Sequence, residues 1–503
     1  MRQTSLALVL SCLVLFLARS ANGQTPTPSA LTSPCPSPMT CPNRMGWAEG
    51  LIGANAGPKS VFPVNDTAIK KVNGVDHPDD CDFHEWSWEA FVWATAIGPD
   101  GYARFRTLHN ADELFGNKAT MTAGKGPKPL SLKPRDLKPT GAPQARSGDE
   151  AAQAGGGMIV DQNGQIVWYS THMNDTYFNF VKANSGANYS KVPPTKNFPV
   201  GSAVFKASWK VVGPGDDATK FYTEKDADVP MLVPNPCGGV MVDPSGASRK
   251  ATVALVGLHV VGVTVNHPEF VWATFEQINN APDLPAGMDP TSPNPVSPQG
   301  FSFYAANTAA NKCNINPTAT GPNELKISDP VKQTVTPITN VFRLYPTGNA
   351  CPARSQDIIA ANTASQQSLA DAGKGRYPNP KETVWANYKL IGTLWLNANT
   401  LKPGDNDMVA EGIGSVNLAN ATLETFFQGQ HKGKSVSCFF CHTTQAQAPD
   451  TKGKNINTSH VILGLIPPPP NASPTPTCTP AASSVAAPSP TPAASPTVSP
   501  PKP

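Results

Sequence analysis

The sequence predicts an α+β fold, with a body rich in antiparallel sheet, a few helices and a proline-rich C-terminal tail. The first observation is the apolar run at 251–265, which a second apolar run at 270–276 follows after a short polar turn. This pattern is typical of a central β-hairpin. The second observation is residues 201–212, where apolar and polar side chains alternate as in a strand with one buried face.

A further hairpin is predicted around Asn163-Gly164, a turn signal that separates apolar runs at 158–160 and 165–169. Residues 382–395, which contain Trp385, are predicted to form a strand or a short helix. A less regular region follows from about 300 to about 368 and carries Cys313 and Cys351.

Three stretches favour helices or short apolar elements. In residues 81–94 aromatic and small side chains recur at helical spacing, which predicts a helix buried on more than one face. Residues 418–428 also have helical spacing, and residues 461–466 form the last apolar run. Between about 118 and 157 the chain is rich in Gly, Pro, Lys and Arg, which indicates a solvated, flexible loop.

Composition excludes some classes of function. The chain has 503 residues, a formal net charge of +3 and 15 % charged residues. Such a weak charge gives no electrostatic reason to expect nucleic-acid binding. The 54 prolines and 40 glycines indicate that much of the chain is loop.

The N-terminus predicts export. Arg2 precedes an apolar run at 6–17, and Ala21-Asn22-Gly23 resembles a small-residue cleavage site. Cys12 leaves a lipoprotein signal open as an alternative, although the apolar run continues past it. No later stretch has the roughly 18 apolar residues of a membrane helix, so no span is expected in the mature chain. We therefore expect a periplasmic or extracellular protein.

The strongest motif is Cys438-Phe439-Phe440-Cys441-His442. Two cysteines separated by two residues and followed by histidine are typical of covalent haem c attachment, since both thiols must reach the same porphyrin edge. The histidine is then placed to bind iron as the proximal ligand. A zinc site needs four ligands, and no second pair of this spacing is present. A thioredoxin-like redox pair would not explain the histidine. A simple disulfide between Cys438 and Cys441 is an open alternative, but it would close a very tight loop.

These observations divide the chain into five expected parts: a signal peptide at 1–23, a Pro/Thr-rich lead-in at 24–42, a strand-rich body at 43–400, a haem c-binding segment packed on the body at 401–466, and a disordered Pro-rich tail at 467–503. Most remaining cysteines should form disulfides in an oxidising compartment. Six of them allow fifteen pairings, with Cys478 left over in the tail: Cys35, Cys41, Cys81, Cys237, Cys313 and Cys351.

The chain resembles a family of exported bacterial proteins known only as monohaem c-type cytochromes without an assigned reaction. The resemblance rests on four pieces between roughly positions 81 and 442: Cys81-x-x-His84-x-Trp86-Ser87-Trp88, Leu258-His259-Val260-Val261 with Val271-Trp272-Ala273-Thr274-Phe275-Glu276, Trp385-x-x-Tyr388-x-Leu390-Ile391-Gly392-Thr393, and Glu424-Thr425-Phe426 with the haem motif. It implies one haem c and electron transfer. The chain departs from small cytochromes c, in which the motif lies near the start and a methionine ligand follows it.

The sixth iron ligand decides which function is expected. Met408 and His431 are the first candidates because nearby chain can bring them to the haem, and His84, His259 and His460 are others. A filled sixth position favours an electron carrier with a redox partner protein. An open position favours a haem-dependent oxidoreductase of the peroxidase or oxygenase type. A third alternative is a non-catalytic haem sensor or envelope protein.

Overall fold

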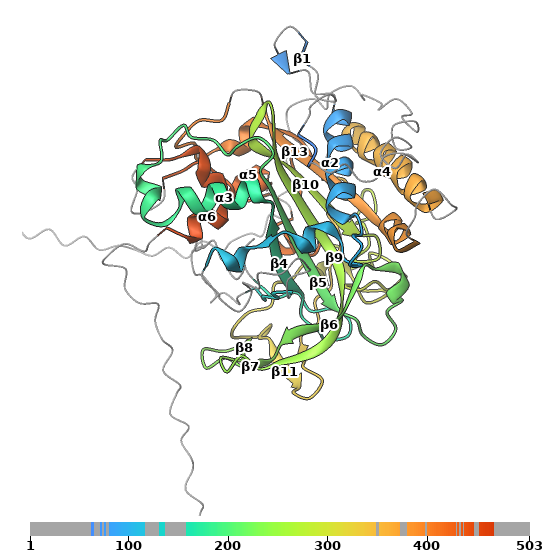
Figure 1. Ribbon diagram of the computed structural model, residues 1–503. Helices are drawn as coiled ribbons and strands as arrows, with labels where there is room; N and C mark the ends of the chain where they lie inside the picture. Colours follow the sequence, from blue (N-terminus) through green and yellow to red (C-terminus); the bar gives the residue numbers. More distant parts are fainter. Residues whose placement is uncertain are drawn as a thin grey trace, which may run out of the picture. The chain divides into compact units, whose positions relative to one another are not determined.

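An eight-stranded antiparallel sheet lies at the centre of the computed structural model (Figure 1). The strand order is β14 (Gly412–Gly414), β13 (Tyr388–Leu396), β10 (His267–Gln277), β9 (Ser248–Thr264), β5 (Ala203–Val211), β4 (Trp168–Met173) and β3 (His109–Asn110), and β6 (Thr223–Pro230) pairs with the first half of β9. The structure describes residues 62–64, 71–72, 75–76, 80–115, 130–135, 157–348, 352–372, 380–397, 400–428, 430–431, 434–435, 437–446 and 452–466. The predicted α+β class with mostly antiparallel sheet is confirmed.

Smaller elements complete the described chain. Four two-stranded sheets pair β1 (Lys71–Val72) with β2 (Val75–Asp76), β7 (Leu232–Pro234) with β8 (Val240–Val242), β11 (Lys326–Asp329) with β12 (Thr334–Thr336), and β15 (Gln430–His431) with β16 (Lys434–Ser435). Short 3-10 turns lie at Arg104–Thr107, Ala111–Glu113, Gly186–Lys191, Ala218–Lys220, Ala310–Lys312, Pro380–Asn387, Met408–Glu411, Thr425–Phe427 and Asn455–Thr458.

The central hairpin of the sheet is β9 and β10, as the two apolar runs predicted. β9 is buried on both faces over most of its length because β5 and β10 flank it and helices cover both sides. The alternating stretch at 201–212 forms β5, and an antiparallel bridge between Val160 and Ile166 forms the small hairpin at Asn163-Gly164. These predictions are confirmed.

Helices α2 (Asp80–Thr95) and α4 (Pro352–Ala372) cover the first face of the sheet (Figure 1). The predicted aromatic helix is α2, and its Phe83 ring stacks on Trp395 of β13 with a centroid distance of 3.7 Å. The region to about residue 368 was expected to be less regular, but its last part belongs to α4, which has 21 residues. Its buried stripe is narrow, with Ile358, Ala361 and Leu369 set among Ala, Ser, Gln and Asn, so the apolar periodicity is weak.

The second face of the sheet is covered by α3 (Asp175–Asn184), α5 (Cys438–Cys441) and α6 (His460–Gly464) (Figure 1). Val261 and Trp272 of the sheet belong to the same buried cluster as Phe439 of α5 and Ile462 of α6. The C-terminal segment therefore shares a core with strands that precede it by more than 150 residues.

Two further sequence expectations were wrong. Residues 418–428 form turns and a single 3-10 turn rather than an α-helix. The Asn420 side chain accepts a hydrogen bond from the Thr422 backbone N–H and the Glu424 side chain accepts one from Asn420, and such local bonds compete with a helix. In the segment expected to be a solvated loop, residues 130–135 pack on the sheet, where Leu130, Leu132 and Arg135 are buried.

Cysteine pairing follows the sequence expectation in part. Cys81 and Cys237 each take part in a disulfide. Cys313 is buried with a free thiol, and burial raises its pKa to about 12. The signal peptide, the lead-in and the proline-rich tail lie outside the described residues. Among the helices that the structure describes, none combines the length and apolar character required to cross a membrane.

Candidate functional site

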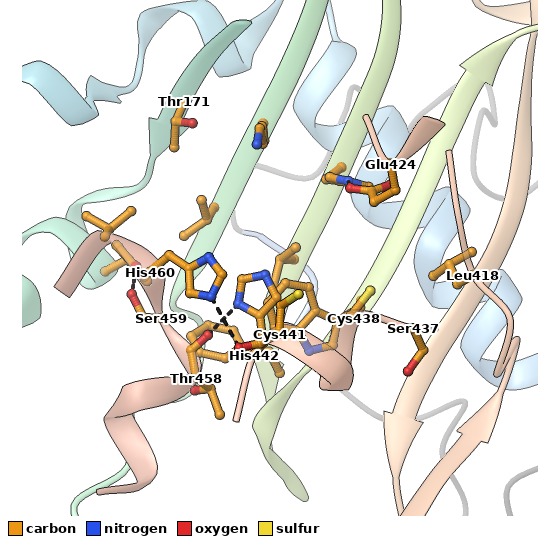
Figure 2. Close-up of a pocket in the computed structure, with 18 of the residues that line it drawn as sticks. Thr171, Leu418, Glu424, Ser437, Cys438, Cys441, His442, Thr458, Ser459 and His460 are labelled. Atoms are coloured by element: carbon orange, nitrogen blue, oxygen red, sulfur yellow. Dashed lines mark hydrogen bonds and ion pairs between the residues drawn. The ribbon is translucent and has the colours of Figure 1, made fainter. Parts of the chain in front are cut away.

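A cavity lies between the second face of the sheet and the C-terminal residues 437–442 and 458–461 (Figure 2). The empty space at this site, counted together with the part that is open to solvent, is about 1000 Å³. Cys438, Cys441 and His442 all line it, as the motif predicted for residues that hold one ligand. Figure 2 shows His460 beside His442, with Cys438 on the side toward Glu424.

The two cysteines of the motif are carried on α5, which is a single helical turn. Neither takes part in a disulfide, so the alternative of a simple Cys438–Cys441 bridge is not present in the structure. Burial, and then the negative charge of nearby Glu424, raises the pKa of Cys438 well above its ordinary value. Cys438 is therefore held in its neutral thiol form.

His442 points its Nδ1 atom at the backbone carbonyl of Thr458 at 2.7 Å. The carbonyl can only accept, so Nδ1 carries the proton and Nε2 carries the lone pair. This is the tautomer that binds a metal through Nε2, and the hydrogen bond fixes the ring orientation. Burial and the neighbouring His460 lower the pKa of His442 well below its ordinary value, which keeps the imidazole neutral.

Two aromatic neighbours hold the His442 ring. The Trp272 ring of β10 lies 4.2 Å from it between centroids, and the His460 ring stacks on it at 3.9 Å with an angle of 17° between planes. His460 Nε2 also lies 3.3 Å from the Cys441 carbonyl oxygen. The motif and the start of α6 therefore form one packed unit.

The loop that presents Thr458 is fixed by the N-terminal half of the chain. Tyr177 of α3 hydrogen-bonds through its hydroxyl to Ser459, and the Tyr189 hydroxyl donates to Asn457 at 2.7 Å. The buried Lys454 ammonium donates to the Val192 carbonyl at 2.8 Å. The carbonyl that orients His442 is thus held by side chains more than 260 residues away in sequence.

The sheet forms the floor of the cavity with two rows of side chains. An apolar row runs across neighbouring strands through Val204, Val261 and Trp272, whose Cα atoms are paired in the ladder. A polar row lies two residues along, about 7 Å away at strand spacing. Its members, also paired in the ladder, are Thr171, Lys206 and His259.

An ion pair stands in the polar row. His259 Nε2 lies 2.6 Å from the Glu424 carboxylate. Burial alone would raise the pKa of Glu424, but the ion pair with His259 and the hydrogen bond from the Asn420 N–H outweigh it and lower the pKa. The loop before Glu424 lies directly on β9, since a Cβ added at Gly257 would meet the Thr422 hydroxyl oxygen at 2.5 Å.

The candidates for a sixth iron ligand fall into three groups. His259 and His460 line the cavity. Met408 is buried in the core beside α5 and is not among the described lining residues, and the side chain of His431 lies outside the described part of the chain. His84 lies in α2, where its Nδ1 is 3.1 Å from the Thr393 hydroxyl and burial lowers its pKa to about 3, so it is a core histidine on the first face.

Sequence reasoning did not identify Lys206 or Thr458 as site residues. Lys206 stands in an alternating strand, where a lysine normally indicates a solvent-facing side. Thr458 acts through its backbone carbonyl, which leaves no signal in side-chain chemistry. Residues 437–442 and 458–461 lie over the cavity that Lys206 lines, and Thr458 supplies the carbonyl. A single sequence gives no signal of that docking.

No family model, curated protein or solved structure matches this chain. In the part of the chain that the structure describes, no three His, Cys, Asp or Glu side chains form a group that could hold a bare metal ion. The haem interpretation does not require such a group, because a porphyrin supplies four nitrogen ligands itself. The thiols, the oriented imidazole and the apolar row fit that cofactor.

Proposed function

We propose that this protein is an exported monohaem c-type cytochrome that carries electrons to or from a redox partner protein. One observation carries the proposal: Cys438, Cys441 and His442 line a single cavity, and the Thr458 carbonyl holds His442 in the tautomer whose Nε2 can bind iron. A haem bound there would supply a one-electron redox centre. The motif in sequence and the cavity in structure are independent supports for the same cofactor.

The chain's own residues have separate roles in this proposal. Cys438 and Cys441 supply the two thiols for covalent attachment, and the spacing of one helical turn lets both reach one porphyrin edge. His442 supplies the proximal ligand, and Trp272 packs against its ring and excludes water. Burial of these groups lowers the local dielectric and thereby influences the reduction potential.

The first experiment is production of the full chain with c-type maturation, followed by absorption spectra with and without dithionite. We expect haem bands that persist in denaturant, because the attachment is covalent. In His442→Ala we expect the normal low-spin or five-coordinate spectrum to be lost. His109→Ala is the matched control, since His109 stacks on Phe178 at 3.8 Å and is not among the lining residues. An unchanged spectrum in His442→Ala would overturn the proposal.

A second candidate, a haem-dependent oxidoreductase, is favoured by one observation. The His259–Glu424 pair lines the same cavity as the motif, and a histidine beside a carboxylate is a common general acid or base. Carbon monoxide distinguishes the two candidates. A reduced spectrum that does not respond indicates two protein ligands and an electron carrier, whereas a clear shift indicates an open face and favours the oxidoreductase.

A further inference from the structure

A lysine and two aspartates form a buried charged cluster outside the main cavity. The Lys210 ammonium on β5 lies 3.2 Å from Asp161 Oδ2 and 2.7 Å from Asp216 Oδ1. The exposed fraction of the side chain is 1 % for Lys210, 0 % for Asp161 and 12 % for Asp216. None of the three is among the residues that line the main cavity, so the cluster is separate from the proposed haem site.

Two carboxyl groups share one ammonium in this cluster. In the part of the chain that the structure describes, Lys210 is the only cation that Asp161 or Asp216 contacts. If all three groups were ionised, a net negative charge would remain in the interior, which is costly. Burial raises the pKa of Asp161 although the charge of Lys210 opposes this shift. Asp161 is therefore the carboxyl group at which burial favours the neutral acid.

The Asp161 carboxyl group is oriented by the backbone. Its Oδ1 atom accepts hydrogen bonds from the N–H of Asn163 at 2.9 Å and the N–H of Gln165 at 2.8 Å. Its Oδ2 atom is buried and faces the Lys210 ammonium without a hydrogen bond to any described residue. Two N–H donors on one oxygen stabilise the negative charge that develops there when a nucleophile adds to the carbon. Oδ1 is thus placed as an oxyanion and Oδ2 as the leaving group.

Asp216 is placed to accept a proton from the lysine. The Lys210 ammonium donates to its Oδ1 atom at 2.7 Å. Its Oδ2 atom accepts from the Gly213 N–H at 2.7 Å and from Asn163 Nδ2 at 3.3 Å. A Cβ added at Gly213 would meet Asn163 Nδ2 at 2.6 Å, so the loop after β5 packs directly on the turn of the small hairpin. The three reacting groups are therefore held together by two rigidly apposed turns.

We propose that Lys210 and Asp161 condense to an intramolecular isopeptide bond, with Asp216 as the proton acceptor. Asp216 takes one proton from the ammonium, and the amine lone pair then attacks Asp161 Cγ. The C–N bond forms and the bond from Cγ to Oδ2 breaks. Oδ2 leaves as water with its own proton and one proton from the nitrogen, while Asp216 keeps the proton that it took. The step requires no oxidant or other reactant, and the amide ties the hairpin at Asn163-Gly164 to β5.

Peptide mapping of the folded full chain tests the proposal. The chain is reduced, alkylated and digested with a protease, and the fragments are analysed by mass spectrometry. We expect a branched peptide that contains Asp161 and Lys210 and is lighter than the two linear peptides together by one water molecule. The matched control is the Lys250–Asp228 pair, which is closer at 2.8 Å but whose side chains are 61 % and 57 % exposed. We expect only linear peptides for it.

A folded chain that yields only linear peptides for Asp161 and Lys210 would overturn the proposal. Branched peptides from the Lys250–Asp228 pair in the same amount would also overturn it, because the bond would then arise from handling and not from the buried site.

Two variants test the chemistry. Lys210→Arg keeps the positive charge, but a guanidinium does not condense with a carboxylic acid, so we expect the branched peptide to be absent. Asp216→Asn keeps the shape of the side chain but cannot take the proton. We expect the branched peptide to form at least about a hundredfold more slowly in this variant. Formation at an unchanged rate in Asp216→Asn would contradict the role of Asp216 as the proton acceptor.

Discussion

Phe439, between the two cysteines, is predicted to dock the motif onto the sheet. Its side chain is 0 % exposed, and its ring meets Trp272 edge-on at 6.2 Å. Replacing a buried phenylalanine with alanine costs about 3–5 kcal/mol, of which the aromatic pair accounts for about 0.5–1.5 kcal/mol. Phe439→Ala should therefore lower the ratio of docked to undocked segment by about a hundredfold to a few thousandfold.

Urea unfolding of the full chain measures this loss, together with the rate at which a protease cleaves near the motif. Phe440→Ala is the matched control, since Phe440 is the next residue of the same helical turn but only half-buried. We expect the control to lose less than about 1 kcal/mol. Equal losses for the two variants, or a loss below about 1 kcal/mol for Phe439→Ala, would refute this account of how the motif is docked.

Two further predictions concern the supports of the site. Burial lowers the pKa of His84 from 6.5 to about 3, so between these values the unfolded chain binds more protons and the folded protein loses stability as pH falls. From about pH 7.5 to about pH 5.5 the free energy of unfolding should fall by about 1.4 kcal/mol because of His84. Urea titrations at both pH values measure this loss, and we expect it to be absent in His84→Asn. Arg343→Met leaves Glu276 buried without its partner at 2.8 Å, which should cost about 3–5 kcal/mol in urea unfolding. The exposed Lys250–Asp228 pair serves as comparison, and Lys250→Met should cost less than about 1 kcal/mol.

The sequence predicts the sheet well because its strands carry strong local patterns. The run at 251–265 and the alternation at 201–212 give β9 and β5 within a few residues. The 21-residue helix α4 gives no such signal, because its buried stripe is formed by small and few apolar side chains. At 418–428 helical spacing is present, but Asn420 bonds to Thr274 and to the Phe275 carbonyl of β10, and these tertiary bonds override the local preference.

The candidate site was also predicted only in part from the sequence. Attachment chemistry is local, so five consecutive residues predict it, whereas the cavity floor depends on which side chains four strands place side by side. The register of the sheet alone makes neighbours of Lys206, His259 and Thr171. The C-terminal residues that pack over this polar row turn it from a solvent-facing surface into a cavity wall. A small cytochrome domain has no such sheet. If the proposed function holds, the large body is required because a haem attached at 438–442 would otherwise have no apolar floor under its ligand.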